Sequence, residues 1–159
     1  KEILRLYKLV YTIYLINCLI ILMIKIEILK ENDVTSKYLE WYKSKEVVRF
    51  SDNQYRNFSL DYQINYVNDC LTNQDLELYG IFDTTKHIGN ICISGLKSYH
   101  SRAEISYVIG DTSYWGKGIA SKAVKLIIKV AIQKYSLNKL FAGTSSKNKA
   151  SQKVLLNFI

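Results

Sequence analysis

The sequence lacks several features that mark whole classes of protein. Its three cysteines, Cys18, Cys70 and Cys92, are odd in number and widely spaced, with no C-x-x-C pair and no histidine at ligand spacing. This pattern argues against a disulfide framework or a zinc site and favours a reducing cytoplasm. We therefore expect a cytoplasmic protein without a metal. Proline is absent altogether, which we interpret as compositional bias and not as a sign of function.

The sequence has no stretch in which charges of one sign are concentrated. The formal net charge of +8 favours an anionic partner, such as nucleic acid, a phosphorylated cofactor or a membrane surface. The lysines are scattered, however, and no basic stretch is interleaved with aromatic residues. We expect a solvated basic surface and no nucleic-acid partner.

The sequence also lacks an apolar run of the usual membrane-spanning length. The run from Leu9 to Ile24 is almost wholly apolar, but a spanning helix needs about 20 such residues. Met23 directly precedes the strand-like stretch IKIEILK. We therefore interpret residues 1–22 as an apolar leader and residues 23–159 as the functional domain. Three interpretations of the leader stay open: it lies outside that domain, it forms a membrane anchor, or it adds a buried element. Membrane contact is expected only if the leader belongs to the native protein.

From Ile24 onward, strand and helix patterns alternate. Residues 46–58 have no clear period and are expected to form a loop that lines a substrate mouth, and His87 and His100 are expected in exposed turns. An Asn or Asp cap is expected for the first helix of this region. The predicted elements are a strand at 24–29, a helix over 32–44, a helix over 59–71, a hairpin of 76–82 and 88–96, a strand at 103–110, a helix over 119–135, a buried strand at 137–144 and a helix from about 148.

The stretch SYWGKGIASKAV places a two-glycine turn between the strand at 103–110 and the amphipathic helix. The first N–H groups of a helix have no backbone partner, and the peptide dipoles add about half a positive charge there. Gly116, Gly118 and Ala120 are small enough for successive amides to wrap an anion, and Lys117 adds charge nearby. The loop therefore predicts a phosphate or pyrophosphate ligand.

Two common phosphate motifs do not match this loop. The dinucleotide fingerprint needs glycine or alanine where Ser121 stands, and an acidic residue about 20 positions further on. A P-loop needs a hydroxyl residue after its lysine, whereas Gly118 follows Lys117.

The loop YWGKGIA resembles the acetyl-CoA pyrophosphate loop of the GNAT superfamily of N-acetyltransferases, whose pattern is Arg or Gln, two residues, Gly, any residue, then Gly or Ala. Gly118 and Ala120 match the last two fixed positions. Trp115 occupies the first, as in the branch that resembles ribosomal-protein N-terminal acetyltransferases of the Rim type. NKASQKVLL resembles the next family motif through Asn148 and Ser151, and EWYKSKEVVRF resembles the start of this branch's acceptor site.

The resemblance implies an α/β (α+β) fold of the GNAT type, with a mixed, mainly antiparallel sheet flanked by helices. It implies transfer of an acetyl group from acetyl-CoA to a primary amine of a small metabolite, such as an amino sugar, or of a protein N-terminus. The polar loop from Asp52 to Arg56 inclines the prediction toward the small molecule. A homodimer is left open.

The alternative is a non-catalytic acyl-CoA-binding module or a truncated, inactive copy. Members of the family continue past the last helix with a Gly-Phe turn and one or two strands, whereas this sequence ends at LLNFI. The expected sheet therefore has its C-terminal strands missing.

The resemblance also assigns roles to single residues. Ser151 would donate to the departing sulfur, and a backbone N–H near Val108 and Ile109 would hold the thioester carbonyl. Glu104 would take the amine proton, or is a surface residue paired with Arg102 or Lys97. Tyr107 and Tyr114 are expected to be structural. The implied cofactor-binding residues are Val108, Ile109, Trp115, Gly116, Lys117, Gly118, Ile119, Ala120, Ser121 and Asn148.

Overall fold

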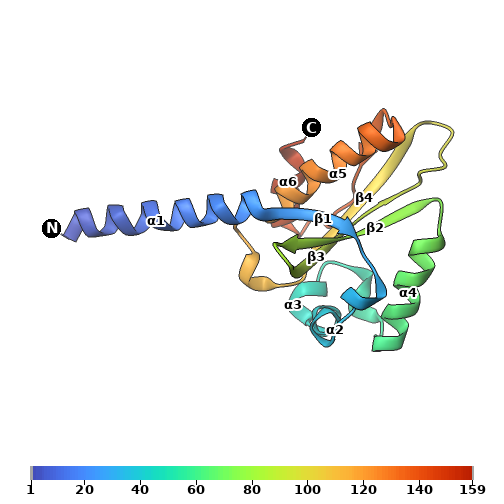
Figure 1. The fold of residues 1–159 in the computed structure, drawn as a ribbon, viewed down its shortest axis with the longest axis horizontal. Coiled ribbons are helices and arrows are strands. Elements are labelled where there is room, and N and C mark those ends of the chain that lie inside the picture. Colours follow the sequence, from blue (N-terminus) through green and yellow to red (C-terminus); the bar gives the residue numbers. More distant parts are fainter. Residues whose placement is uncertain (1, 159) are drawn as a thin grey trace.

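A five-stranded sheet in the order β1-β2-β3-β4-β5 organises the chain (Figure 1). The computed structural model describes the backbone of residues 2–158 and the side chains of residues 10–21 and 23–158. All neighbouring strands are antiparallel except β4 and β5, which are parallel. The predicted mixed, mainly antiparallel sheet is therefore confirmed. The strands are β1 Ile24–Ile28, β2 Leu76–Asp83, β3 Lys86–Ser94, β4 Arg102–Ile109 and β5 Lys139–Phe141.

Helices cover both faces of this sheet (Figure 1). Helix α5 lies on one face with α6 beside it, and α2 and α4 lie on the other. The helices are α1 Glu2–Met23, α2 Ser36–Lys43, α3 Lys45–Val48, α4 Leu60–Thr72, α5 Ile119–Tyr135 and α6 Lys149–Leu156, with 3-10 turns η1 Glu31–Asp33, η2 Asp52–Tyr55 and η3 Thr112–Tyr114.

Two hydrophobic clusters hold the layers together. On the α5 face, Ala123, Val124 and Ile127 of the helix pack against Ile91 and Ile105 of the sheet, and all five are buried. The apolar spacing of α5 directs these side chains to one side of the helix, so the sequence pattern itself specifies this contact.

The second cluster joins the other face of the sheet to α2 and α4. Tyr38 and Trp41 of α2, Val67 of α4 and Leu78 of β2 are its buried members. It fixes α2 against the sheet beside the end of β4, where Trp41 closely approaches Gly110.

Local capping explains where the helices begin and corrects one prediction. The N-cap of α2 is Thr35, whose hydroxyl accepts a hydrogen bond from the Tyr38 N–H at 3.3 Å. The Asp33 carboxylate instead accepts from the Lys30 N–H at 2.9 Å within η1. The expected Asn or Asp cap is thus wrong. Ser59 caps α4 as its position predicts.

Three further expectations differ from the structure. Residues 46–58 contain most of the short helix α3 and the turn η2, and the Ser51 hydroxyl caps η2 by accepting from the Asn53 N–H. Strand β5 is three residues long at a sheet edge, with Phe141 44% exposed, and is not buried. His87 lies within β3 and stacks against Tyr38 and Phe82, so its expected exposed position is wrong.

Helix α1 runs directly into β1 and projects away from the sheet (Figure 1). Side chains such as Val10, Tyr14 and Leu19 are exposed, whereas Ile20 and Ile21 pack against the α5-face cluster. Within the described residues, no helix combines the length and apolar character needed to cross a membrane. The boundary at residue 23 stays a prediction.

Gly110 leaves no room for a side chain, because a Cβ there would lie 2.0 Å from the Trp41 ring. We expect Gly110→Ala to lower the free energy of unfolding by about 1–3 kcal/mol, since the indole or the strand end must shift. Urea denaturation measures this change. Gly143→Ala is the matched control, because its Cβ would meet only Glu104 Oε1 at 4.0 Å. Equal losses in the two variants would contradict the packing argument.

Candidate active site

The site is built around an open edge of β4. This strand pairs with β3 from Glu104 to Ile109, but with β5 only from Arg102 to Glu104. Residues 105–109 therefore have no strand neighbour on the β5 side within the part of the chain that the structure describes. Strand β5 ends at Phe141, opposite Glu104, and leaves this part of the edge open.

The backbone N–H and C=O groups of successive residues point to alternate sides of β4 along this edge. The Gly110 N–H donates to the Ile88 carbonyl on β3 at 3.0 Å, whereas the Ile109 carbonyl accepts from the Trp115 indole N–H at 2.8 Å on the other side. Alternate residues of a strand direct their backbone groups to the same side. The Val108 N–H therefore faces β3, and the N–H groups of Tyr107 and Ile109 face the open edge. Of the predicted pair, Ile109 is the candidate donor.

The glycine loop begins just beyond this edge. Gly116 and Gly118 adopt φ values of +72° and +78°, in the left-handed region where glycine is favoured. Gly118 is the N-cap of α5, and its carbonyl accepts from the Lys122 N–H at 3.0 Å. Buried Ile119 anchors the helix start in the core. The two glycines thus bend the backbone around the first turn of a 17-residue helix.

Free N–H groups line this turn. The backbone N–H groups of residues 117–121 form no hydrogen bond with any described residue. They include the N–H groups of Ala120 and Ser121, which are half-buried, and the Lys117 ammonium lies 5.7 Å from the centre of the Tyr114 ring. Ile21 lies against the loop, since a Cβ on Gly118 would be 3.2 Å from its Cδ1. Convergent N–H donors at a helix N-terminus fit the negative charge of a pyrophosphate.

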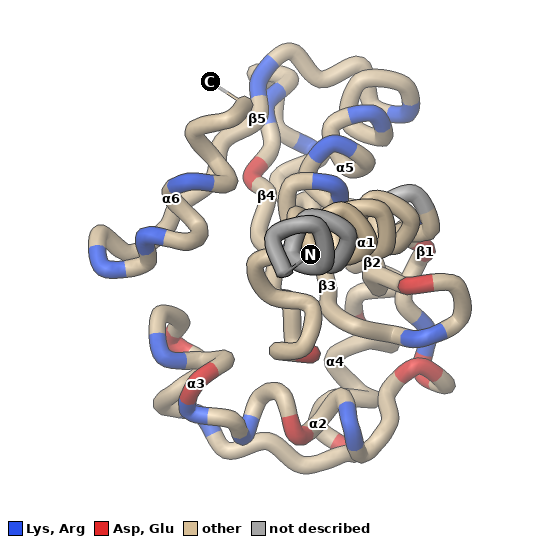
Figure 2. The backbone as a smooth tube through the Cα atoms, turned by 90° about the vertical axis from the view of Figure 1, so that its left-hand side faces the viewer, with Lys and Arg blue, Asp and Glu red and all other residues tan. Residues whose placement is uncertain are grey.

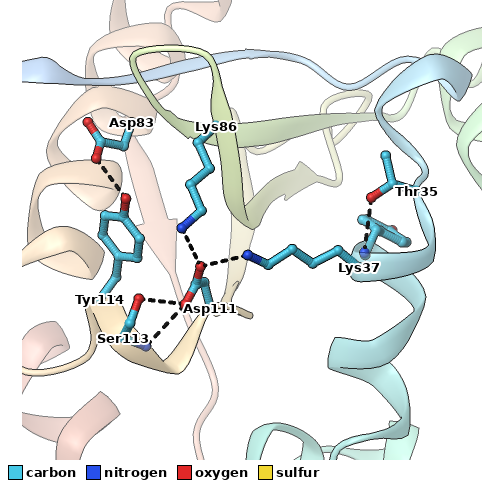
Figure 3. Close-up of polar contacts among 8 residues, drawn as sticks. Thr35, Lys37, Asp83, Lys86, Asp111, Ser113 and Tyr114 are labelled. Atoms are coloured by element: carbon cyan, nitrogen blue, oxygen red, sulfur yellow. Dashed lines mark hydrogen bonds and ion pairs between the residues drawn. The ribbon is translucent and has the colours of Figure 1, made fainter.

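Asp111 connects this loop to two other parts of the fold (Figure 3). Its carboxylate accepts from the Ser113 N–H and hydroxyl at 3.1 and 2.7 Å. It also pairs with Lys37 of α2 at 3.3 Å and with Lys86 of β3 at 2.9 Å. Its side chain is only 11% exposed. One carboxylate thus joins the end of β4 to the β2–β3 turn and to α2.

The charge of Asp111 is stabilised in the folded chain. Burial alone would raise the pKa of this carboxyl, but the hydrogen bonds from Ser113, Lys86 and Lys37 outweigh burial and hold the pKa well below its usual range. The same contact raises the pKa of Lys86. Nearby, the Tyr114 hydroxyl donates to Asp83 at 2.7 Å, which supports its predicted structural role.

A hydroxyl pair lies on the α6 side of β4. The Tyr107 and Ser151 hydroxyls are 2.9 Å apart, although 44 residues separate them in sequence. Burial raises the pKa of Tyr107, partly opposed by the bond with Ser151, so the phenol stays protonated at neutral pH. The Asn148 side chain accepts from the Ser151 N–H at 3.1 Å and thereby caps α6. The structure thus places Ser151 with a tyrosine that the sequence interpretation treated as structural.

Glu104 faces the opposite side of β4 from Tyr107, because the two positions differ by an odd number of residues. It is exposed, and among the described side chains it has no ion-pair partner, so the pairing with Arg102 or Lys97, the alternative to its proton-accepting role, is not formed. Burial is the main cause of the raised pKa of Cys92 on the same face, and the charge of Glu104 raises it further. Glu104 therefore belongs to the face that α2 and α4 cover.

The sequence interpretation missed Asp111 and its lysine partners as well as Tyr107. An Asp-x-Ser step after a strand favours a local turn, which could have indicated the bonds from Ser113. Nothing in the sequence links Asp111 to Lys37, or Tyr107 to Ser151, because both contacts depend on long-range packing.

This arrangement is that of an acyltransferase fold. The spermidine N-acetyltransferase of Vibrio cholerae, solved in complex with CoA and spermine, matches with a TM-score of 0.74 at 14% identity, covering 85% of this chain and 79% of its own. Mycobacterium smegmatis RimJ in complex with CoA-disulfide matches with a TM-score of 0.73 at 14% identity, covering 84% and 68%. Identities this low show a shared fold.

A family model described as an acetyltransferase (GNAT) domain matches residues 24–158. The chain belongs to this family, as the sequence resemblance predicted. The uncharacterized N-acetyltransferase p20 of Bacillus licheniformis is 31% identical over 94 residues, which cover 58% of this chain and 52% of that protein. The chain therefore spans about half the length of this curated relative.

The variant Asp111→Asn keeps the side-chain shape but removes the charge between Lys37 and Lys86. We expect it to lower the free energy of unfolding at pH 7 by about 1–3 kcal/mol, because charge-assisted hydrogen bonds are lost. The folded-state pKa of Asp111 is lowered, so its stabilisation is present above the ordinary value of about 4 and fades as the pH falls below it. Denaturant unfolding between pH 7 and pH 3 measures this dependence.

Asp69→Asn is the matched control, because Asp69 is an exposed residue of α4 whose carboxylate makes no described hydrogen bond or ion pair. Its unfolding free energy should change by less than about 0.5 kcal/mol. The Asp111 network would be refuted if both variants lost the same stability, or if the Asp111→Asn difference did not shrink in acid.

Proposed function

We propose that the chain is an N-acetyltransferase that binds acetyl-CoA at the glycine loop and transfers the acetyl group to a primary amine. The observation that carries this proposal is the open edge of β4 followed, through the glycine loop, by a helix N-terminus whose first N–H groups have no partner among the described residues. Family membership and the fold shared with CoA-bound acetyltransferases support it.

The loop and the strand edge would hold different parts of the same molecule. The N–H groups of residues 117–121 would bind the pyrophosphate, with Trp115 keeping the loop close to Ile109. The open edge of β4 would bind the pantetheine amides as an added strand. Acetyl-CoA, when bound, supplies the activated thioester.

The Ile109 N–H would donate to the thioester carbonyl oxygen. Negative charge develops on this oxygen during attack by an amine, and a fixed backbone donor stabilises that charge without reorganising. Because the contact uses the backbone, it does not depend on the Ile109 side chain.

Ser151 would protonate the departing sulfur, and Tyr107 would position the Ser151 hydroxyl and return a proton to it. The separation of 2.9 Å allows this transfer, and the raised pKa of Tyr107 keeps a proton on the phenol. Asn148 would orient the start of α6 by capping it.

Glu104 would take the proton that the amine loses, directly or through water, because it lies on the face of β4 opposite Tyr107. Glu104 lies five positions before Ile109 on β4, a distance of about 17 Å along a strand, so the acceptor and water must fill the interval. The acceptor itself is a small metabolite amine or a protein N-terminus. The Rim-type opening of the loop and the fold shared with RimJ favour this branch of the family.

Calorimetric titration with acetyl-CoA tests the binding site. We expect Gly118→Ala to weaken binding at least about tenfold, because a side chain at φ +78° distorts the loop. Gly95→Ala is the matched control, since Gly95 has a φ of +81° but lies in the turn after β3. The control should lose similar stability while its Kd stays within about twofold. Equal weakening in both variants, or no binding by the folded chain, would refute the site.

Substitution of the hydroxyl pair tests the chemistry, measured as CoA thiol release with the best amine of a screened panel. Ser151→Ala should lower kcat about 100-fold with little change in the Kd for acetyl-CoA, because only the proton donor is lost. Tyr107→Phe should cost less, since Ser151 remains. Ser146→Ala is the control, because Ser146 is an exposed residue of the loop before α6 whose hydroxyl makes no described contact.

An unchanged kcat in Ser151→Ala would remove Ser151 from the mechanism. Tight acetyl-CoA binding with no turnover for any amine would favour the alternative, a non-catalytic acyl-CoA-binding module.

A further inference from the structure

A cavity of about 610 Å³ opens on the α2 and α3 side of the fold. Four cationic side chains line it: Lys43 at the end of α2, Lys45 and Arg49 around α3, and Arg56 after η2. Its other lining residues are polar or apolar, and no carboxylate is among them. The cavity is thus positively charged on several sides.

The four cations have no neutralising partners among the described residues. None of them takes part in an ion pair, and none donates a described hydrogen bond. Figure 2 shows acidic residues on the same segment, but Glu46 and Asp52 do not line the cavity. Four exposed cations without ion-pair partners around one cavity favour the binding of an anion there.

Aromatic and amide side chains complete the cavity. The rings of Tyr42 and Phe58 lie 5.1 Å apart, and Asn53 and Gln54 add hydrogen-bonding groups. The Tyr42 side chain is held in place, because its hydroxyl accepts a hydrogen bond from the Asn90 side-chain amide at 3.2 Å. A compact ligand with an apolar or hydroxylated body and a charged group fits these walls.

Arg49 connects the cavity to the proposed site. Its guanidinium carbon lies 6.0 Å from the centre of the Trp115 ring, and the Trp115 indole N–H bonds to the Ile109 carbonyl at the open edge of β4. The cavity therefore adjoins the strand end where the thioester would lie. It is on the same side of the sheet as α2 and α4, the side that Glu104 faces.

We propose that this cavity binds an anionic group, a carboxylate or a phosphate, carried by the amine that is acetylated. The inference rests on the proposed function, because the acceptor amine is defined by acetyl transfer. Lys43, Lys45, Arg49 and Arg56 hold the anion, and the amine extends past Trp115 toward the end of β4. Polycations such as spermidine are repelled by the same four charges.

Binding to the CoA-saturated chain tests this inference with pairs of probes in which one member carries an anionic group that the other lacks. Glucosamine 6-phosphate is compared with glucosamine for phosphate, and alanine with alanine amide for carboxylate, with spermidine as the polycation. We expect at least one anionic probe to bind at least about tenfold more tightly than its neutral partner, and spermidine to bind most weakly. The pair that shows the difference identifies the anionic group.

The double variant Arg49→Gln, Arg56→Gln should remove this difference while the Kd for acetyl-CoA stays within about twofold. Arg102→Gln is the matched control, because Arg102 is exposed at the start of β4 and does not line the cavity. It should keep the full preference. Thermal unfolding verifies that the variants are folded.

Failure of the inference and failure of the proposed function give different results. Equal binding of anionic and neutral probes, or a preference for spermidine, overturns the anion site whether or not acetyl-CoA binds. Loss of acetyl-CoA binding in the double variant also overturns it, because the cations would then hold the phosphates of CoA. Absence of acetyl-CoA binding in the unaltered folded chain instead overturns the proposed function.

Discussion

The unpaired edge of β4 is the constraint on which the rest of the site depends. Backbone N–H and C=O groups need partners, and an edge strand leaves a row of them available. Here β5 pairs with β4 over three residues only, so the N–H groups of Tyr107 and Ile109 face a side of β4 that has no strand neighbour among the described residues. On this open side the Trp115 indole N–H donates to the Ile109 carbonyl, and this bond holds the glycine loop near the end of the strand. A ligand with its own amides completes this ladder.

Several interactions hold the glycine loop at that edge of β4. Asp111 bonds within its own turn and to lysines from α2 and β3, so three separate parts of the chain meet at one carboxylate. Its lowered pKa means that the network stays charged throughout the neutral range. Below it, Trp41 fills the space that a side chain on Gly110 would occupy. The loop is therefore held by charge on one side and by close packing on the other.

The sheet divides the chemistry between its two faces. The Tyr107 and Ser151 hydroxyls lie on the α5 and α6 side, whereas Glu104 faces the α2 and α4 side, where the cationic cavity opens. Proton donation to a leaving group and proton removal from an amine would thus occur on opposite sides of one strand. Strand alternation alone produces this separation, since neighbouring residues point in opposite directions.

Features that depend on nearby residues were determined by the sequence itself. The apolar spacing of α5 specified its bounds, the two glycines specified the left-handed turn before it, and Asn148 specified the cap of α6. Each depends on side chains within about one helical turn, so local propensity is enough. The family also followed from such motifs, because the loop pattern is local.

Only the tertiary structure decided which distant groups meet. It brought Ser151 to Tyr107, gathered Lys37 and Lys86 around Asp111, placed His87 half-buried within β3 and limited β5 to three residues. It also directed the Val108 N–H toward β3 and the Ile109 N–H toward the open edge of β4. These outcomes depend on strand register and on packing between layers, where contact partners lie tens of residues apart and local propensity carries no information about them.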